Sequence, residues 1–177
     1  MCEVILYDNE GCTGKREDFT SDTPDLGVKF FSGTARSLKV KGNHWIGYTG
    51  KNYTGDRKIF GEGEHEQLGN FDRKINSLQL LKTDLSHPSI VLYEHVHFKG
   101  EYRTVDMRID DLKRAGFVEL VLSHNVKSGV WILYEDANCQ GKHMIALEGE
   151  EVANYCALGW NDKMSSLRPL LTSDKEV

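Results

Sequence analysis

A tyrosine followed seven positions later by a glycine occurs four times along the chain, and this repeat constrains the fold more than any other feature. The four copies are "YDNEGCTG", "YTGKNYTG", "YEHVHFKG" and "YEDANCQG", with almost unrelated residues between the two fixed positions. The tyrosines stand at positions 7, 48, 93 and 134, so the steps are 41, 45 and 41 residues. A fixed internal period of this kind determines the architecture before any local pattern is considered.

The repeat also has a longer period, because positions 93 and 7 differ by 86, as do positions 134 and 48. Trp45 and Trp131 obey it, each three residues before its tyrosine. The four copies are therefore paired in the order A, B, A, B. The polar stretch "KTDLSHPS" lies between the second and third copies and predicts a domain boundary. We expect domains over 1–82 and 89–171, a linker over 83–88 and a polar tail over 172–177.

Short segments rich in β-branched and aromatic residues, such as "CEVILY", "RSLKVKG" and "VWILYED", are bounded by Gly, Asn and Asp, which is typical of strands. Helical periodicity is nearly absent, apart from "RIDDLKRAG" and "EEVANYCAL" as single turns or short helices. A serine followed by an apolar residue or by glycine is expected to mark the start of the final strand of each copy, at Ser37, Ser77, Ser128 and Ser166. The predicted fold class is all-β, with two Greek-key β-sandwich domains, each built from two motifs.

The spacing of tyrosine and glycine has a physical reason in such a fold. A folded-over hairpin needs a residue at positive φ where the chain doubles back, and glycine adopts it without a Cβ penalty. We expect the aromatic ring to cover that bend, so ring and glycine keep a fixed spacing while the loop between them varies. The motif is predicted to be structural rather than chemical.

Composition excludes several classes of function. A net charge of −5 with scattered Lys and Arg offers no basic stripe for nucleic acid. The longest apolar runs are far shorter than the ~20 residues of a membrane helix, and "MCEVILYDNE" lacks the pattern of a signal peptide. We therefore expect a cytoplasmic protein. Its four cysteines, at positions 2, 12, 139 and 156, are then expected to be free thiols.

These residues together resemble the βγ-crystallin superfamily, whose Greek-key signature is an aromatic residue, six variable residues and a glycine. The match covers essentially the whole chain. Stretches such as "FTSDTPDL", "VKGNHWIGY" and "WNDKMSSLRPL" resemble non-lens, epidermis-type members and their invertebrate relatives. The resemblance implies two wedge-shaped β-sandwich domains, no enzymatic activity and, as in many members, calcium binding.

Calcium sites of that family use the pattern N/D-N/D-x-x-S/T-S, in which the two loops of one domain serve each other. "NDKMSS" at 161–166 fits the pattern, whereas "SGTARS", "DRKINS" and "SHNVKS" depart from it. The last of these would place Lys127 at the fifth position, where the family has Ser or Thr. A hairpin carbonyl just after the signature aromatic completes each site. The implied ligands are Asn161, Asp162, Lys163, Ser165, Glu94 and Glu135 in the second domain and, more weakly, Asp72, Lys74 and Asn76 in the first.

Oxygen ligands of this kind suit Ca²⁺, and each site here has at least one poor ligand, so we expect weak binding. The alternative is that "NDKMSS" is a polar turn whose Asn and Ser side chains bond backbone groups. No Gly-x-Ser-x-Gly elbow, His-Glu-x-x-His helix or dinucleotide-binding glycine turn occurs, so an enzyme is not expected.

Two other interpretations stay open from the sequence. The first is an interaction module, or a subunit of a larger complex, without functional calcium sites. The second is a four-bladed propeller, but it predicts equal spacing, and the 86-residue period disfavours it. The linker would allow the domains to pair within one chain or to exchange between two, so self-association is the partner expectation besides calcium.

Overall fold

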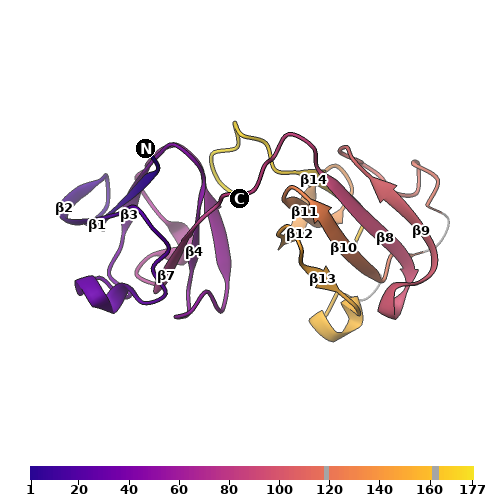
Figure 1. Cartoon of the computed structure of the whole chain (residues 1–177), viewed down its shortest axis with the longest axis horizontal. Helices are drawn as coiled ribbons and strands as arrows, with labels where there is room; N and C mark the ends of the chain where they lie inside the picture. Colours follow the sequence, from indigo (N-terminus) through magenta and orange to yellow (C-terminus); the bar gives the residue numbers. More distant parts are fainter. Residues whose placement is uncertain (118–119, 161–163) are drawn as a thin grey trace. The chain divides into compact units, whose positions relative to one another are not determined.

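The computed structural model describes residues 1–117, 120–160 and 164–177, and short antiparallel strands form most of its regular structure (Figure 1). The chain divides into two compact units. The first unit contains residues 1–82 together with 172–177, and the second contains residues 83–171. Each unit is a pair of sheets, so the all-β, Greek-key fold class is confirmed.

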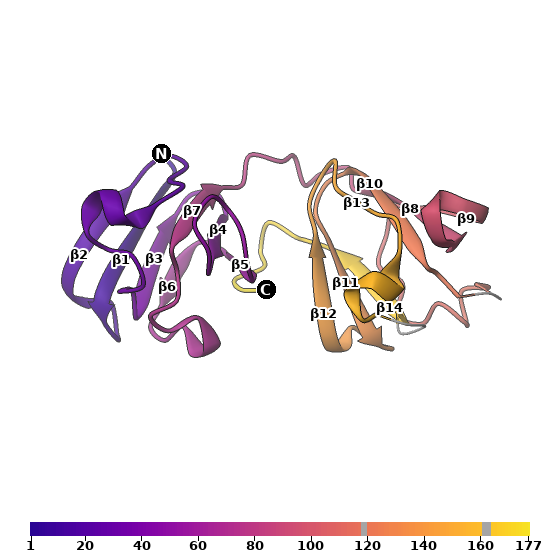
Figure 2. The ribbon, with the colours of Figure 1, turned by 90° about the horizontal axis from the view of Figure 1, so that it is seen from below.

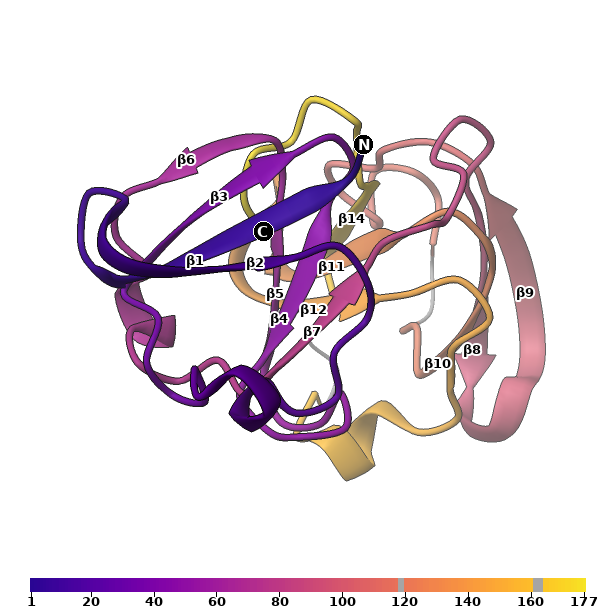
Figure 3. The ribbon, with the colours of Figure 1, turned by 60° about the vertical axis from the view of Figure 1, so that its left-hand side comes forward.

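The first unit has a four-stranded sheet in the order β2-β1-β3-β6 and a three-stranded sheet in the order β5-β4-β7, which Figure 3 shows as two layers. Its elements are β1 (Glu3–Asn9), β2 (Thr13–Phe19), η1 (Leu26–Lys29), β3 (Ser37–Lys41), β4 (Trp45–Tyr48), β5 (Arg57–Phe60), β6 (Gly63–His65), η2 (Gly69–Phe71) and β7 (Ser77–Leu80), where η marks a 3₁₀ turn.

The second unit repeats this plan with sheets in the orders β13-β10-β8-β9 and β12-β11-β14. Its elements are β8 (Ser89–His95), η3 (Val96–Phe98), β9 (Lys99–Val105), β10 (Ser123–Ser128), β11 (Trp131–Asp136), β12 (Gln140–Ala146), β13 (Glu151–Val152), η4 (Tyr155–Leu158) and β14 (Ser166–Pro169). The short turn expected within "EEVANYCAL" is therefore η4, and "RIDDLKRAG" forms a hydrogen-bonded turn over residues 112–116 rather than a helix.

Two motifs interlock in each unit because each contributes a strand to the other's sheet. In the first unit, β6 comes from the second motif but pairs with β3 of the first. In return, Thr23 of the first motif forms an antiparallel bridge with Leu78 on β7. The second unit has the same exchange, with β13 beside β10 and Ile109 bridged to Leu167. A single motif would leave both sheets incomplete, so the unit of folding is the pair.

The core of each unit lies between its two sheets, as expected when alternate strand residues face inward. Val4 and Leu6 on β1 pack with Leu38 and Val40 on β3, and Trp45 on β4 joins them from the other sheet. Both repeated tryptophans are fully buried. The corresponding cluster in the second unit contains Ile90, Leu92, Val126, Trp131, Leu133, Tyr155 and Trp160.

The position of the third repeated serine differs from the sequence expectation. Tyr7 lies opposite Ser37, Tyr48 opposite Ser77 and Tyr134 opposite Ser166. In the third copy the residue opposite Tyr93 is Ser123, whereas Ser128 lies at the other end of β10, opposite Ser89. Ser128 was therefore the wrong choice, because it shares the Ser-apolar or Ser-Gly dipeptide pattern but not the strand register.

Residues 172–177, expected as a polar tail, instead pack against the first unit, beside β5 (Figure 2). Val177 and Ile59 exchange two backbone hydrogen bonds of 2.8 and 3.0 Å, and Phe60 forms an antiparallel bridge with Glu176. We call residues 172–177 the return segment. It follows the last strand of the second unit but completes a sheet of the first.

Candidate metal site

Each of the four hairpins is attached to its sheet by the buried serine opposite its tyrosine. Ser37 Oγ donates to the carbonyl oxygen of Asn9 at 2.5 Å and accepts from the N–H of Cys12 at 2.9 Å. The other three serines make the same two bonds, with Gly50 and Tyr53 for Ser77, His95 and Phe98 for Ser123, and Asp136 and Cys139 for Ser166. All four serines are fully buried, so these bonds are made away from water.

The repeated glycine satisfies two requirements in each hairpin. Gly14 has φ of 85°, and a Cβ there would lie 2.2 Å from Oδ1 of Asp8. That oxygen accepts the N–H of Lys15 at 2.8 Å, so a side chain on Gly14 would displace the bond that closes the hairpin. Gly141 is equivalent, with φ of 80° and only 2.4 Å to Asp136 Oδ2. Glycine is needed for conformation and for space.

Sequence reasoning missed that other residues of the hairpins are left-handed too. Five residues after the tyrosine, Cys12, Tyr53, Phe98 and Cys139 have φ between 54° and 60°. These are the residues whose N–H donates to the buried serine, and that bond holds a conformation uncommon outside glycine. The side-chain types at this position are too varied for a pattern to reveal it.

The loop that leads into each buried serine corresponds to the calcium loop of the expected family, and one hydrogen bond identifies its fifth residue. The N–H of the residue before the serine donates to the carbonyl oxygen of the signature tyrosine, at 2.8 to 3.0 Å. The residues are Arg36, Asn76, Leu122 and Ser165. In the third copy the fifth position therefore holds Leu122, and the assignment to Lys127 was wrong, because "SHNVKS" is the strand β10 itself.

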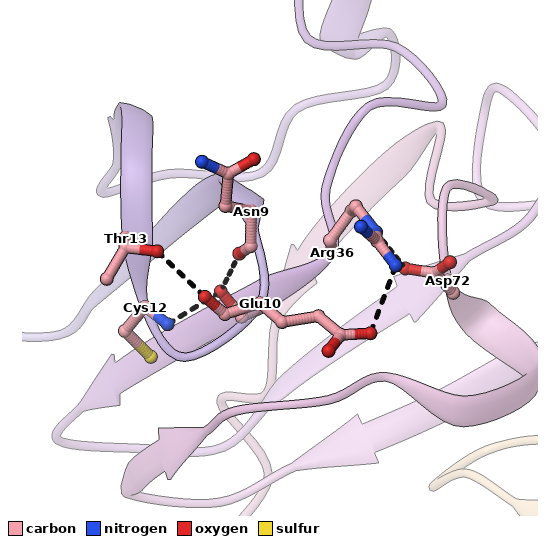
Figure 4. A network of polar contacts seen from close by, with 7 residues as sticks. Asn9, Glu10, Cys12, Thr13, Arg36 and Asp72 are labelled. Carbon is pink, nitrogen blue, oxygen red and sulfur yellow. Dashed lines mark hydrogen bonds and ion pairs between the residues drawn. The ribbon is translucent and has the colours of Figure 1, made fainter.

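In the first unit the two loops meet, and an arginine lies between two carboxylates (Figure 4). Arg36 Nε lies 3.2 Å from Oδ1 of Asp72, and one of its terminal nitrogens lies 3.0 Å from Oε1 of Glu10. Asp72 is the first residue of the second loop, so this pair links the fifth position of one loop to the first position of the other. The guanidinium supplies the positive charge that a metal ion would bring.

The reciprocal pair in the first unit consists of neutral groups. Ser32 Oγ, at the first position of its loop, hydrogen bonds Oδ1 of Asn76, at the fifth position of the other. The Asn76 amide donates to the carbonyl oxygens of Thr49 at 2.6 Å and Lys74 at 3.2 Å. The predicted ligands Asp72, Lys74 and Asn76 therefore do lie in one loop, but each already bonds a protein group.

In the second unit the structure places only part of the predicted site. Asn161, Asp162 and Lys163 lie outside the described residues. Ser165 is half-buried, and its backbone bonds Tyr134 and Leu112 at 2.9 Å. Glu94 Oε2 accepts the N–H of Glu101 at 3.2 Å, so its carboxylate closes its own hairpin, as Asp8 does. Glu135 follows Tyr134 on β11 and is half-buried.

In the second unit, a buried histidine and a buried tyrosine form a pair. His124 Nδ1 lies 2.6 Å from the Tyr155 hydroxyl, and both side chains are almost fully buried. Burial lowers the pKa of His124 to about 4, against a smaller opposing effect of Glu150. Burial also raises the pKa of Tyr155 well above its usual value. The pair is therefore neutral near pH 7 and belongs to the core.

The described residues offer little for catalysis or for a cluster-type metal site. Nowhere in residues 1–117, 120–160 and 164–177 do three His, Cys, Asp or Glu side chains gather as metal ligands would. Burial, followed by the nearby Glu64, raises the pKa of the Cys12 thiol, which disfavours the thiolate form that a nucleophile needs. Within the same residues, no helix has the length and hydropathy of a membrane span.

Interlocked pairs of Greek-key motifs, each with its tyrosine, glycine and buried serine, define a class of repeat-built β-sandwich proteins. The family model described as Beta/Gamma crystallin matches residues 3–81 and 89–170. The chain belongs to the beta/gamma crystallin family, whose members are structural proteins that are generally not enzymes.

Similar sequences support the expected resemblance to non-lens, epidermis-type members. The chain is 35% identical to Epidermal differentiation-specific protein of Cynops pyrrhogaster over 177 residues, which are 100% of this chain and 52% of that protein. It is 26% identical to Beta/gamma crystallin domain-containing protein 1 of Homo sapiens, over 96% of this chain and 8% of that protein. The chain thus spans about half, or much less, of the length of these relatives.

Two solved structures align with nearly the whole chain. Geodin, a beta-gamma crystallin from Geodia cydonium, has a TM-score of 0.40 and 23% identity, covering 96% of this chain and 99% of Geodin. Protein S, whose solution structure is described as complexed with calcium, has a TM-score of 0.41 and 16% identity, covering 96% and 100%.

Proposed function

We propose that this chain is a non-enzymatic, cytoplasmic structural protein whose two units keep their fold without a bound ligand, and which binds calcium weakly through loop 161–166. The observation that carries the proposal is the Arg36 bridge. In the first unit a permanent protein cation lies between Asp72 and Glu10, so both carboxylates have a cationic partner without metal. The four free cysteines favour a reducing compartment.

Calcium binding is proposed for the second unit because its fourth loop keeps Ser165 at the fifth position and matches the family pattern throughout 161–166. The partner loop provides Leu122 where a hydroxyl ligand would be, so one oxygen of the shell is lost. A site with fewer protein oxygens belongs to the weak range, roughly 10⁻⁴ to 10⁻³ M.

Calorimetric titration of calcium into the wild type and Asp162→Ala tests this proposal. We expect one weak site in the wild type and at least about a fivefold loss of affinity in the variant, because a carboxylate ligand is removed. Equal affinities, or a tight site that Asp162→Ala leaves unchanged, would show that loop 161–166 is a turn and not a metal site.

A role as an interaction module is the second candidate, and Phe30 favours it. Phe30 is 86% exposed and has φ of 58°, at the C-cap of η1. Gly159 occupies the matching position after η4, with φ of 75°. A large apolar residue thus stands where a glycine would be less strained, beside exposed Val28. Affinity capture with the wild type and Phe30→Gly should differ if this face binds a partner, and identical captures would remove the candidate.

A further inference from the structure

The return segment binds the first unit as a peptide ligand binds a receptor. β5 is the outer strand of the sheet β5-β4-β7, and an outer strand offers backbone groups with which a further strand can pair. Residues 175–177 bond this edge as an extra antiparallel strand: Ile59 with Val177 twice, and the Gly61 N–H to the Lys175 carbonyl at 2.7 Å. This is strand addition, in which backbone bonds provide affinity and side-chain pockets provide specificity.

Side chains of the first unit recognise the segment as well. The Lys58 side chain is only 16% exposed, and a charged group with little access to water is costly without a partner. The Glu176 carboxylate forms an ion pair with it and also lies 3.7 Å from His65 Nδ1. His44 Nε2 lies 2.7 Å from the Asp174 carbonyl oxygen and must donate to it, because a carbonyl only accepts.

A glycine gives the segment room to approach. A Cβ on Gly61 would lie 2.2 Å from the carbonyl oxygen of Asp174, so any other residue there would push the segment away. The register of β11 with β12 pairs Trp131 with Ala146 as that of β4 with β5 pairs Trp45 with Phe60. The positions of Lys58 and Gly61 are therefore held by Met144 and Leu147 in the second unit. Of the two equivalent edges, β5 and β12, only β5 has the lysine that pairs with the acidic segment and the glycine that gives it room.

We propose that the β5 edge, with His44, Lys58, Gly61 and His65, is a strand-docking site for an extended acidic segment, and that a second copy of this chain supplies that segment by exchange. Every copy carries both the site and residues 174–177, which leave the second unit just after Leu170, anchored there by its bond to Val130. Reciprocal exchange satisfies both sites in a closed, two-fold pair. Occupation within one chain competes through an effective concentration on the order of 1 mM, so dilute wild type stays monomeric.

The first test measures docking in trans on the full chain. In one variant the resident segment is weakened by Glu176→Lys, which opposes Lys58, and by Val177→Pro, which removes the N–H donated to Ile59. A synthetic peptide of residues 171–177 is titrated while the Ile59 and Gly61 amide signals are followed by NMR. We expect saturable shifts at these amides, with affinity at least about tenfold higher than for wild type, whose site is filled. No shift at about 2 mM peptide, or equal binding to both chains, overturns the proposal.

The second test identifies the source of the segment by exchanging charges between copies. The Lys58→Glu and Glu176→Lys chains each carry a mismatched pair, whereas a mixture offers the lysine-bearing segment of one variant to the glutamate-bearing site of the other. Sedimentation at about 100 μM should show at least about fivefold more dimer in the mixture than in either variant alone. The chain with both changes restores the pair internally and should sediment as wild type. If the mixture shows no more dimer than the two variants measured separately, exchange between copies is contradicted. A positive peptide titration would then mean that the β5 edge binds an acidic segment of another protein.

Discussion

The N–H of Leu122 donates a 3.0 Å hydrogen bond to the carbonyl oxygen of Tyr93, as the N–H of Ser165 does to Tyr134 at 2.9 Å. This bond places Leu122 at the fifth position of the third loop. An isobutyl group therefore stands where a hydroxyl oxygen would complete a calcium shell with the fourth loop. We attribute the proposed weakness of the second unit's site to this residue and not to a charge at Lys127, which lies exposed on β10.

Replacing Leu122 with serine should return the missing oxygen and tighten calcium binding by about tenfold, which corresponds to ~1.4 kcal/mol. Lys127→Ser is the matched control and should leave the affinity unchanged. Calorimetric titration of both variants against the wild type provides the measurement. If Lys127→Ser tightens binding and Leu122→Ser does not, the register of β8 with β10 does not define the site.

Arg36→Ser should make the stability of the first unit depend on calcium, whereas the wild-type unit is expected to be stable without metal. Without calcium, the loss of a partly exposed ion-pair network should lower the free energy of unfolding by about 1 kcal/mol. Calcium should restore much of it, because Asp72 and Glu10 then need a cation and the introduced hydroxyl offers an oxygen ligand. Urea unfolding with chelator and with calcium measures both effects.

The control for this experiment is Arg16→Ser, since Arg16 also pairs with a carboxylate, Asp18 at 3.6 Å, but lies on exposed strand β2. It should change stability little and show no response to calcium. A calcium response of equal size in both variants would mean that surface charge, and not the loop geometry, is responsible.

Ser123→Ala should destabilise the second unit by about 1 to 3 kcal/mol, because it leaves the His95 carbonyl and the Phe98 N–H without their buried partner. Ser128→Ala removes only a half-buried hydroxyl that donates to the His87 carbonyl, and should cost at most about 1 kcal/mol. Denaturant melts compare the two. A larger loss of stability from Ser128→Ala would mean that Ser128, as the dipeptide pattern predicted, is the equivalent of the other three serines.

The sequence alone predicts the fold class well because the tyrosine, glycine and tryptophan positions are set by backbone geometry that few residues satisfy. The prediction of the serine opposite Tyr93 fails because strand register is a long-range property. The pairing of β8 with β10 places Ser123 there, and the residues next to it in the sequence do not reveal this. The Arg36 bridge was likewise missed as a site, although an arginine at the fifth position and an acid at position 72 carried the signal. No local sequence pattern predicts the docking of residues 174–177 on β5.

Acid should destabilise the second unit through His124. Its pKa is about 4 in the folded chain and about 6.5 when unfolded, so between these values only the unfolded chain gains the proton. The stability that neutral His124 contributes to the folded chain is fully present above about pH 6.5 and is lost as the pH falls towards 4. The loss in the free energy of unfolding amounts to about 3 kcal/mol. His124→Gln cannot titrate, so its stability should fall less over this range. Equal pH profiles in urea melts would contradict a buried neutral histidine.

The most direct test of a ligand-independent structural protein is hydrogen exchange of the wild type with chelator and with about 1 mM calcium, resolved by unit. We expect protected β-strands in both units under chelator. In calcium, protection of the first unit should stay unchanged, and the second unit should gain about 0.4 to 1.4 kcal/mol, as a dissociation constant of roughly 10⁻³ to 10⁻⁴ M requires. Loss of protection under chelator, or a calcium-dependent gain in the first unit, would contradict this expectation.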